Sequence, residues 1–527
     1  MKRKVLLSVF ISLMTVFVLA ACATSGGNTN DDGNSSGGKS KSKDKNEVTV
    51  AFQENVQTLD PHESSSGIDI SVIITMYESL LTPDQDGELE PLLAEDYSIS
   101  DDGLSYTFQL REDVEFTDGE PFNAEAVKAN VDRILDSEGA INSYKGLRSV
   151  DHVEVDDEFE VTVHLKDINS QFLSKIGNLR IISPKAIEEE ADFSKESYGT
   201  GPFVLESWDH GDSVVVTKNE DYWEEGLPKV DKVTMRPIPE DGSRMAMLKT
   251  GEVDYAFPVP VNDVDELQND DSVDVGIMES TYVNYVTINT YKEPYNDLKV
   301  RQAMNHAIDK EAYIKVVKNG YAQESDSPLP ATNNFYEQQE TYEYDLDKAK
   351  ELLAEAGYPD GFEAEIWGSD SSKDKRGMEF IQQQLAEVGI DVEVKQYERA
   401  TLSDEINNPE SPDDAKIQMW YVGWSSTVGD ADNAINPLFT TSAIPPNGSN
   451  TAYFSNDEVD ELTQEALHAE TDELAKEKYA ELQEIIMEEA PWIFLGVDEE
   501  ATAKAKGLDG IWRSADGNFY LRDVSWE

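Results

Sequence analysis

Few residues in this sequence have the spacing that catalysis or metal binding requires. No two of its six histidines form an i, i+4 pair, the spacing that places two metal ligands on one helical face; they lie at positions 62, 152, 164, 210, 306 and 468. The zinc-protease motif HExxH is absent. The chain has 107 acidic residues, so neighbouring carboxylates are common and do not indicate acid–base catalysis. We therefore predict a protein that is not an enzyme and that has neither a cofactor nor a metal site.

The single cysteine, Cys22, directly follows an apolar stretch, residues 5–21, that contains no charge. Three basic residues at 2–4 precede the stretch and small residues end it, which is typical of a secretory signal peptide. The sequence LAAC at 19–22 resembles the bacterial lipobox, whose cysteine is diacylated and becomes the N-terminus after cleavage. We expect a lipoprotein signal peptide at 1–21 and a lipid on Cys22. The alternative is a chance cysteine in the signal peptide of a soluble protein. With Cys22 acylated, the mature chain would have no free thiol and no disulfide.

The formal net charge is -64 at pH 7, and the acidic residues are spread along the whole chain. This charge excludes nucleic acid as a partner, because a phosphate backbone requires clustered Lys and Arg. It also excludes a polybasic contact with anionic lipid, so the lipid on Cys22 would be the membrane anchor. We interpret the acidity as a heavily hydrated surface, and an anionic ligand would need a locally positive pocket.

The first half of the chain predicts a tether followed by a β-rich region. Residues 22–46 are rich in Gly, Ser, Asn and Lys and predict a flexible tether. In LSYTFQLREDVEF, the residues Tyr106, Phe108 and Leu110 alternate with polar ones, which predicts a strand with one buried face. Two hairpins are expected, with turns at 156–158 and 210–212, and one helix at NAEAVKANVDRIL.

The second half predicts helices and a parallel crossover unit. Residues 300–317 place five apolar residues on one helical face: Val300, Ala303, Met304, Ala307 and Ile308. A second helix is expected to begin after an Asp345 cap, and Ser455 to cap a third in a capping box with Glu458. Residues 362–397 read as strand, helix, strand, which predicts two parallel strands. These elements indicate an α/β fold.

The segments above also carry a resemblance to a known family. The chain resembles the extracytoplasmic solute-binding proteins of peptide- and nickel-type ABC importers, solute-binding family 5, across nearly all of residues 47–527. The matching segments occur in the family's order, at 58–62, 77–135, 199–223, 289–313 and 347–362. Within this class the chain most resembles the glutathione-binding proteins, through the segments 247–260, 420–439 and 484–497.

The resemblance implies a two-lobed, periplasmic-binding-protein-like fold that closes on its ligand about a hinge. The first lobe would be discontinuous, with a β-rich subdomain inserted into it. The implied parts are 47–80, 201–290 and 495–527 for the first lobe, 81–200 for the inserted subdomain and 291–494 for the second lobe.

The resemblance also implies how the ligand's amino group is recognised. In peptide-binding members an Asp three residues after the Trp of a GW turn pairs with the peptide's α-amino group. Here that turn is 423–427, so Thr427 stands in the place of the Asp and the charge is missing. This departure suits an offset amino group, as in the γ-linked glutamyl of glutathione, with Asp430 and Asp432 taking over the ammonium contact. The alternative is that both Asp residues are ordinary surface residues of an acidic chain.

Five further residues are expected at the ligand cleft. Trp424 and Ser426 belong to the GW turn, and Trp424 would otherwise be a core residue. Tyr282, Asn284 and Tyr285 precede the crossing between the lobes, although strand alternation must turn one side of that segment to the core.

A ligand carboxylate requires a cation, and Arg offers two parallel donors. In dipeptide-binding members an Arg just before a helix of the second lobe has this role, and KDKRGMEFIQ places Arg376 there. The alternative for Arg376 is a solvent-facing position at a helix N-terminus, where Arg opposes the macrodipole.

The function implied is a binding protein, anchored by lipid to the extracytoplasmic face of the cell membrane. It would capture peptides, in particular glutathione, as a monomer and deliver them to the permease subunits and ATPases of an ABC importer. The alternatives are a general peptide-, nickel-chelate- or haem-binding protein of the same fold, and a peptide-sensing or chaperone-like lipoprotein not coupled to import.

Overall fold

A mixed sheet of 11 strands forms the centre of the computed structural model, which describes residues 46–64, 66–85, 87–141, 143–409, 411–426 and 430–527. The predicted signal peptide, Cys22, most of the tether and Thr427 lie outside these residues. No helix in the described ranges is long and apolar enough to cross a membrane. Along the sheet the strands are β15 (Asp391–Tyr397), β14 (Glu363–Ser369), β16 (Met419–Ser425), β12 (Val273–Ile288), β17 (Trp492–Ala505), β11 (Tyr255–Val259), β1 (Glu47–Phe52), β10 (Lys232–Pro237), β9 (Ser213–Lys218) and β8 (Phe203–Asp209), with β13 (Ala322–Glu324) paired to β17.

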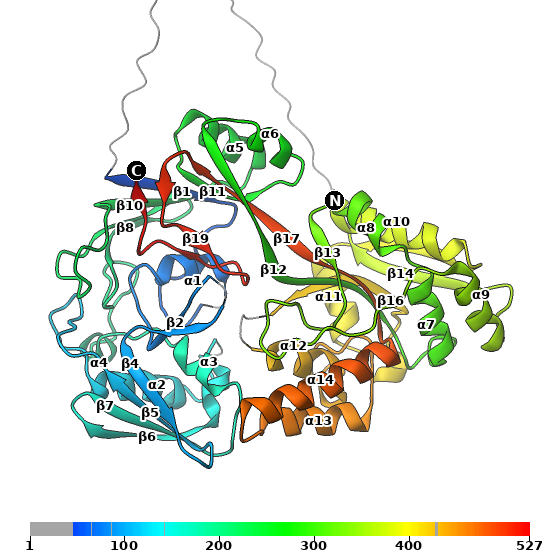
Figure 1. Cartoon of the computed structure of the whole chain (residues 1–527), viewed down its shortest axis with the longest axis horizontal. Coiled ribbons are helices and arrows are strands. Elements are labelled where there is room, and N and C mark those ends of the chain that lie inside the picture. Colours follow the sequence, from blue (N-terminus) through cyan, green and yellow to red (C-terminus); the bar gives the residue numbers. More distant parts are fainter. Residues whose placement is uncertain (1–45, 65, 86, 142, 410, 427–429) are drawn as a thin grey trace, which may run out of the picture. The chain divides into compact units, whose positions relative to one another are not determined.

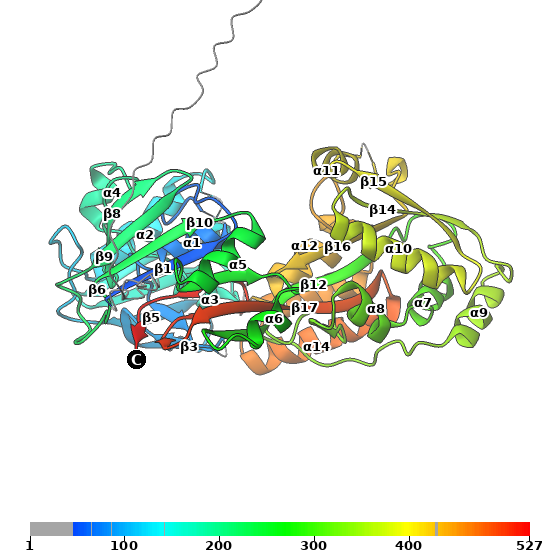
Figure 2. The same cartoon turned by 90° about the horizontal axis from the view of Figure 1, so that it is seen from above.

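The long strands β12 and β17 run from one lobe into the other, as Figures 1 and 2 show. They pair with each other over most of their length, from Val273–Ala505 to Thr287–Trp492. One end of β17 pairs with β11 of the first lobe, and the far end of β12 pairs with β16 of the second. The pairing of β12 with β17 shifts register between Glu279 and Val283, at the passage between the lobes.

The first lobe surrounds strands β1 and β8–β11 and carries the inserted subdomain. Its small elements are α1 (Gly67–Ile73), α5 (Asp241–Thr250), α6 (Val264–Gln268), β18 (Leu508–Asp509), β19 (Trp512–Arg513), β20 (Phe519–Tyr520) and β21 (Ser525–Trp526). The inserted subdomain contains β2 (Leu81–Pro83), β3 (Leu89–Pro91), β4 (Ala94–Ile99), β5 (Ser105–Leu110), α2 (Ala124–Asp136), η1 (Lys145–Ser149), β6 (Val150–Asp157), β7 (Glu160–Leu165), α3 (Phe172–Gly177) and α4 (Pro184–Glu188).

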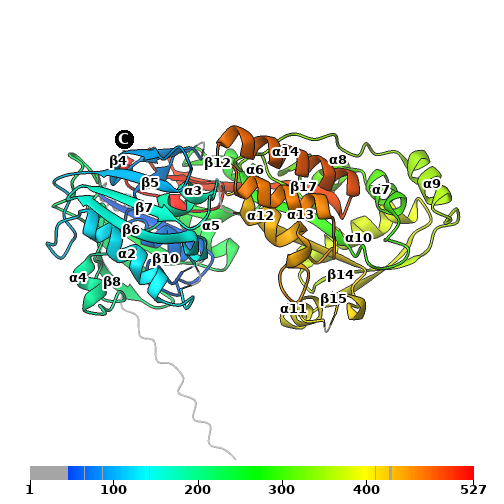
Figure 3. The ribbon, with the colours of Figure 1, turned by 90° about the horizontal axis from the view of Figure 1, so that it is seen from below.

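The inserted subdomain confirms the predicted alternation and both hairpins. Its sheet is antiparallel in the order β4-β5-β7-β6, and Tyr106, Phe108 and Leu110 of β5 are all buried in its core. Strands β6 and β7 form one predicted hairpin, and β8 and β9 form the other. Helix α2 covers one face of the sheet, with its N-cap Asn123 accepting a hydrogen bond from Ala126 N. In Figure 3 this sheet lies in one lobe, with α3 on the side nearest the second lobe.

The second lobe packs helices on both faces of its part of the sheet (Figure 1). One face is covered by α7 (Leu298–His306), α8 (Lys310–Val317), α9 (Leu346–Glu355) and α10 (Ser372–Ala386), and the other by α12 (Asp432–Phe439), α13 (Asp457–Leu467) and α14 (Asp472–Glu489). The remaining elements are α11 (Arg399–Asn407), η2 (Pro412–Asp414) and η3 (Thr441–Ala443). The predicted crossover unit is confirmed, because β14 and β15 are parallel neighbours joined through α10.

Two local predictions need correction. The segment 300–317 is not one helix: α7 ends at His306, and α8 begins again at Lys310, because the Asp309 side chain accepts a hydrogen bond from Ala312 N and caps a new first turn. The helix at 457 is capped by Asn456 and not by Ser455, since the Asn456 side chain accepts from two backbone N–H groups. The Asp345 cap is confirmed, with the side chain accepting from Lys348 N.

Candidate ligand-binding site

A cavity of about 660 Å³ lies where the inserted subdomain meets the second lobe. The inserted subdomain contributes Ser143, Tyr144, Gly146, Leu147, Asn169, Ser174, Lys175 and Asn178. The second lobe contributes Trp424, Asp430, Asp432, Asn433, Asn436, Pro437, Ser442, Ala443, Asn447, Gly448, Ser449 and Leu467. A volume of this size is within the usual range for small-molecule sites. The lining combines polar side chains with apolar ones such as Trp424 and Leu467, so it suits a ligand with both polar and apolar parts.

Direct contacts hold the two sides of the cavity together at one edge. Just before α3, Ser170 donates from its backbone N to Leu467 O at 2.8 Å and from its hydroxyl to Ala466 O at 2.9 Å. Beside it, the Asn334 amide donates to Gln171 Oε1 at 3.0 Å. The segment that leads into α3 is therefore joined to the end of α13.

Opposite charges face each other within this cavity. The Lys175 ammonium of α3 lies 3.4 Å from Asp430 Oδ2, and both side chains are mostly buried. Asp430 also accepts a hydrogen bond from Asn433 N, near the start of α12. Asp432, the first residue of α12, lines the same cavity. The site thus combines one cation with two carboxylates in a partly desolvated space.

Trp424 supplies an apolar wall and an unused donor. It lies on β16, packs against the core cluster under α12–α14 and lines the cavity. Its Nε1–H is shielded from solvent and has no hydrogen-bond partner among the described residues. A buried N–H normally has a partner, so an acceptor on a bound ligand would satisfy it. Ser426, two residues on, is buried, and its hydroxyl accepts a hydrogen bond from Asn333 Nδ2 at 2.9 Å.

The three predicted residues of β12 take different positions, none of them in the lining of this cavity. Tyr285 is 3% exposed and stacks on Trp492 with ring centroids 3.5 Å apart, so it is a core residue and not a ligand contact. Asn284 is also buried, and its amide donates to Asp498 Oδ1 at 2.7 Å. Tyr282 is half-buried, with the Lys373 ammonium 5.1 Å from its ring centroid.

A charged cluster, buried at Lys318 and open to solvent at Lys373, lies beside Asn284. The Lys318 ammonium lies 2.7 Å from both Asn284 Oδ1 and Asp498 Oδ1, and Lys373 lies 3.5 Å from the other Asp498 oxygen. Burial lowers the pKa of Lys318 to about 8, and the attraction of Asp498 opposes that shift. The cluster positions Tyr282 and Asn284 beside two cations that the sequence analysis missed.

Arg376 lies near the start of α10, with its side chain exposed, and it does not line the cavity. The cation that the cavity does contain, Lys175, was not predicted. It comes from a short helix in the inserted subdomain, and no motif around it indicates a ligand contact.

A second hollow, of about 200 Å³, lies beside Glu78 in the first lobe. The Glu78 carboxylate is fully buried and accepts hydrogen bonds from Thr200, Tyr222 and Trp223 at 2.7–2.9 Å. Because protein groups already satisfy this carboxylate, we do not assign the ligand to this hollow.

One sequence pattern lies outside the described residues. GNSSGGKS at 33–40 fits the letters of the P-loop pattern, and its first five residues fit GxSxG. The P-loop requires a strand before it and a helix after it, and this stretch lies within the Gly- and Ser-rich segment.

The chain matches known proteins over most of its length. Residues 88–445 match the model of the bacterial extracellular solute-binding proteins, family 5 Middle. The chain is 36% identical over 482 residues to the glutathione-binding protein GsiB of Salmonella typhi, which covers 91% of this chain and 94% of that protein.

Solved structures agree with this match. HbpA2 of Haemophilus parasuis superposes with a TM-score of 0.82 at 27% identity, covering 92% of this chain and 100% of that one. The ABC transporter-associated periplasmic binding protein DppA of Helicobacter pylori, in complex with the peptide STSA, gives a TM-score of 0.72 at 28% identity, covering 91% and 98%. The two-lobed fold, the cavity and these matches agree: the chain belongs to the bacterial extracellular solute-binding proteins of family 5.

Proposed function

We propose that this protein captures glutathione in the cavity at Trp424 and delivers it to the permease and ATPase subunits of an ABC importer. The observation that carries the proposal is the 36% identity, over 482 residues, to a protein named for glutathione binding. The peptide STSA bound to DppA, a relative of the same fold, supports a short peptide as the ligand class.

The charges at the cavity suit this ligand. Glutathione carries one ammonium and two carboxylates at neutral pH, and its ammonium is displaced from the position it has in an ordinary peptide. Asp430 and Asp432 would hold that ammonium, and Lys175 would exchange its contact with Asp430 for a ligand carboxylate. Trp424 Nε1–H would donate to a ligand oxygen. By the family resemblance, Thr427 stands in the place of the Asp that pairs with an ordinary α-amino group, and its lack of charge suits an offset amino group.

The second ligand carboxylate needs another cation. Arg376 remains our candidate, by the family resemblance, and would reach the ligand when the lobes close about β12 and β17. Tyr282 and Asn284, beside Lys373, would border the same part of the closed cleft.

Anchoring and delivery follow from the N-terminal sequence. A lipid on Cys22 would hold the protein at the extracytoplasmic face of the cell membrane. A coil of the length of residues 23–46 has a root-mean-square reach of roughly 25–30 Å, so a monomeric body could meet a permease in the same membrane. With Cys22 acylated, no thiol would remain to form a mixed disulfide with glutathione.

The test is calorimetric titration of the full-length chain in detergent with reduced glutathione, oxidised glutathione and unmodified di- to pentapeptides. We expect saturable binding of glutathione that weakens in Trp424→Phe, which removes the indole N–H but keeps an aromatic wall. Trp208→Phe, a half-buried Trp on β8 outside the cavity lining, is the matched control. Binding of ordinary peptides alone would contradict the glutathione proposal.

Two further variants identify the cation. Lys175→Gln and Arg376→Gln each remove one charge and keep a polar side chain. A loss of affinity in Lys175→Gln alone would assign the carboxylate contact to the inserted subdomain and remove Arg376 from the site. A loss in Arg376→Gln alone would do the reverse, and a loss in both would support one carboxylate contact for each.

A further inference from the structure

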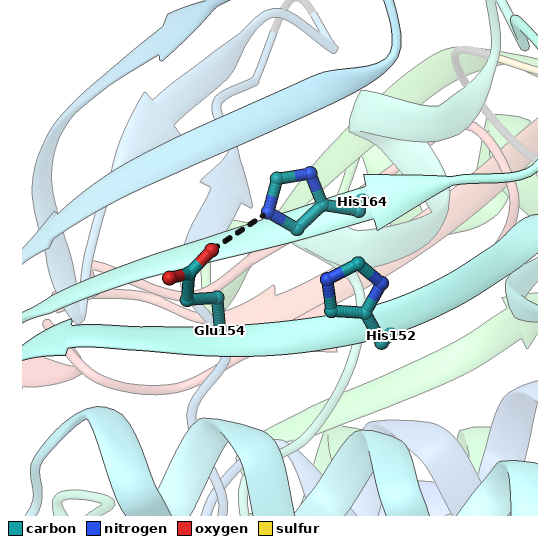
Figure 4. Close-up of side chains that lie close together, drawn as sticks. All are labelled: His152, Glu154 and His164. Carbon is teal, nitrogen blue, oxygen red and sulfur yellow. Dashed lines mark ion pairs between the residues drawn. The ribbon is translucent and has the colours of Figure 1, made fainter.

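Two histidines and a glutamate meet on the exposed face of the inserted sheet. His152 on β6 and His164 on β7 are directly opposite each other, with ring centroids 4.4 Å apart and planes 14° from parallel. Glu154 is two residues after His152 on the same strand, so its side chain is on the same face. Its Oε2 lies 3.4 Å from His164 Nε2, as Figure 4 shows. One ligand atom from each of the three residues lies within 4.8 Å of the other two.

The outer contacts of the imidazoles leave one nitrogen of each ring available. His152 Nδ1 is 2.9 Å from Asp151 Oδ2, and His164 Nδ1 is 2.9 Å from Ser105 Oγ. In Figure 4 each ring presents its other nitrogen to the side where the Glu154 carboxylate lies. His164 Nε2 is shielded from solvent and makes no hydrogen bond among the described residues. A metal-bound histidine usually has this arrangement, with its second nitrogen donating to a carboxylate or hydroxyl that fixes the ring.

We infer that His152, Glu154 and His164 form a binding site for a borderline divalent transition-metal ion, on the inserted subdomain and outside the ligand cavity. Two imidazoles and one carboxylate suit Zn²⁺, Ni²⁺ or Cu²⁺, whereas Ca²⁺ and Mg²⁺ prefer an all-oxygen set. A tetrahedral ion with bonds of about 2.0–2.1 Å separates its ligand atoms by roughly 3.4 Å. The ligand atoms, which lie within 4.8 Å of one another, therefore need to approach by at most about 1.4 Å, which rotation of the exposed His152 and Glu154 side chains allows.

The site has an open coordination position. Three protein ligands leave the fourth position of a tetrahedral ion for water or another small ligand. The charge of the chain also favours the site, because a net charge of -64 raises the concentration of cations at the surface. No spacing along the sequence indicates this cluster, since strand pairing, and not a helical turn, brings His152 to His164.

The test is titration of the full-length chain in detergent with Zn²⁺, in excess Mg²⁺ so that ordinary carboxylate sites are occupied, and without glutathione. We expect one Zn²⁺ to bind with an affinity that falls more than about 10-fold in His152→Ala and in His164→Ala. Co²⁺ should give the strong visible absorption of a tetrahedral site, and the same variants should lose it. Ser105→Ala removes only an outer contact and should weaken Zn²⁺ about 10-fold while keeping the Co²⁺ spectrum.

The controls make either outcome decisive. His210→Ala removes an exposed histidine in the β8–β9 turn and should bind Zn²⁺ like the unmodified chain. Because His152 is on the surface, His152→Ala should keep the thermal midpoint of the metal-free chain. No Zn²⁺ binding in excess Mg²⁺, or equal binding by His152→Ala and His210→Ala, would overturn the proposal. Neither result would bear on glutathione binding, which is measured without metal.

Discussion

The buried side chain of His62 gives a testable prediction about the contact between the first lobe and the wall of the cavity. Its side chain is fully buried, and Nε2 contacts Arg180 O at 2.8 Å. The imidazole packs edge-on against Tyr144, a cavity residue whose hydroxyl donates to Asn178 O at 3.2 Å. Next to it, Asp60 accepts two hydrogen bonds from Arg133 of α2. The segment 58–62 therefore fastens the inserted subdomain to the first lobe behind the cavity wall.

Burial, and secondarily the charge of Arg133, lower the pKa of His62 from 6.5 to about 4, against the opposing hydrogen bond to Arg180 O. Between these two values the unfolded chain binds more protons than the folded chain, so the free energy of unfolding falls as the pH falls. A difference of about 2.5 pH units is equivalent to about 3 kcal/mol. Most of this loss, about 2 kcal/mol, should occur between about pH 7 and pH 4.5.

The variant His62→Gln isolates this effect, because a glutamine amide also donates to Arg180 O and does not titrate in this range. Urea unfolding, followed by tryptophan fluorescence at about pH 7 and pH 4.5, gives the free energy of unfolding of each protein. We expect the unmodified chain to lose about 2 kcal/mol more than His62→Gln on acidification. The numerous acidic residues contribute equally to both proteins and cancel in the difference.

The control is His210→Gln, whose side chain is exposed, and it should lose as much stability on acidification as the unmodified chain. Parallel losses in His62→Gln and the unmodified chain would refute the reasoning. They would mean that His62 is protonated in the folded state at pH 4.5, or that its surroundings open before it titrates.

Three other predictions concern stability and use the same unfolding assay. Burial lowers the pKa of Lys318 to about 8, so between about pH 8 and pH 10.5 the unfolded chain binds more protons than the folded chain. As the pH rises through this range, the free energy of unfolding of the unmodified chain should therefore increase relative to that of Lys318→Met. Parallel pH profiles of the two proteins would contradict this. Tyr285→Ala should cost about 3 kcal/mol or more because it removes the ring that stacks on Trp492, whereas Tyr291→Ala, at an exposed ring, should change stability by less than about 0.5 kcal/mol. Asp345→Ala should cost about 1 kcal/mol through loss of the α9 cap, and Asp345→Asn, which keeps an acceptor, should restore most of it; equal costs would mean that the cap contributes nothing.

Local patterns in the sequence were sufficient to predict much of the fold. The alternation at Tyr106, Phe108 and Leu110 predicts a strand, because one face of an antiparallel sheet must be buried. The choice between neighbouring capping residues was not predictable, since Ser455 and Asn456 are both good N-caps and tertiary packing decides where α13 begins. The break between α7 and α8 was missed because the apolar period continues across Asp309.

The cavity was predictable only where one short segment supplies several of its residues. Trp424, Asp430 and Asp432 lie close together in the sequence and border one cavity. Lys175 faces Asp430 from another subdomain, and no local pattern in either segment reports that contact. The pairing of His152 with His164 is hidden for the same reason, since strand register depends on the whole hairpin.

The continuity of β12 and β17 has a consequence for how such proteins diversify. Val283 and Val497 pair with each other at the passage between the lobes. The residues between them in the sequence, 284–496, form one continuous segment of the chain. That stretch contains Trp424, Asp430 and Asp432, whereas Lys175 lies outside it. Recombination at two points that are adjacent in space would therefore exchange the entire second lobe between relatives as a single cassette. The donor would bring its own GW turn, and the recipient would keep its inserted subdomain and its N-terminal anchor.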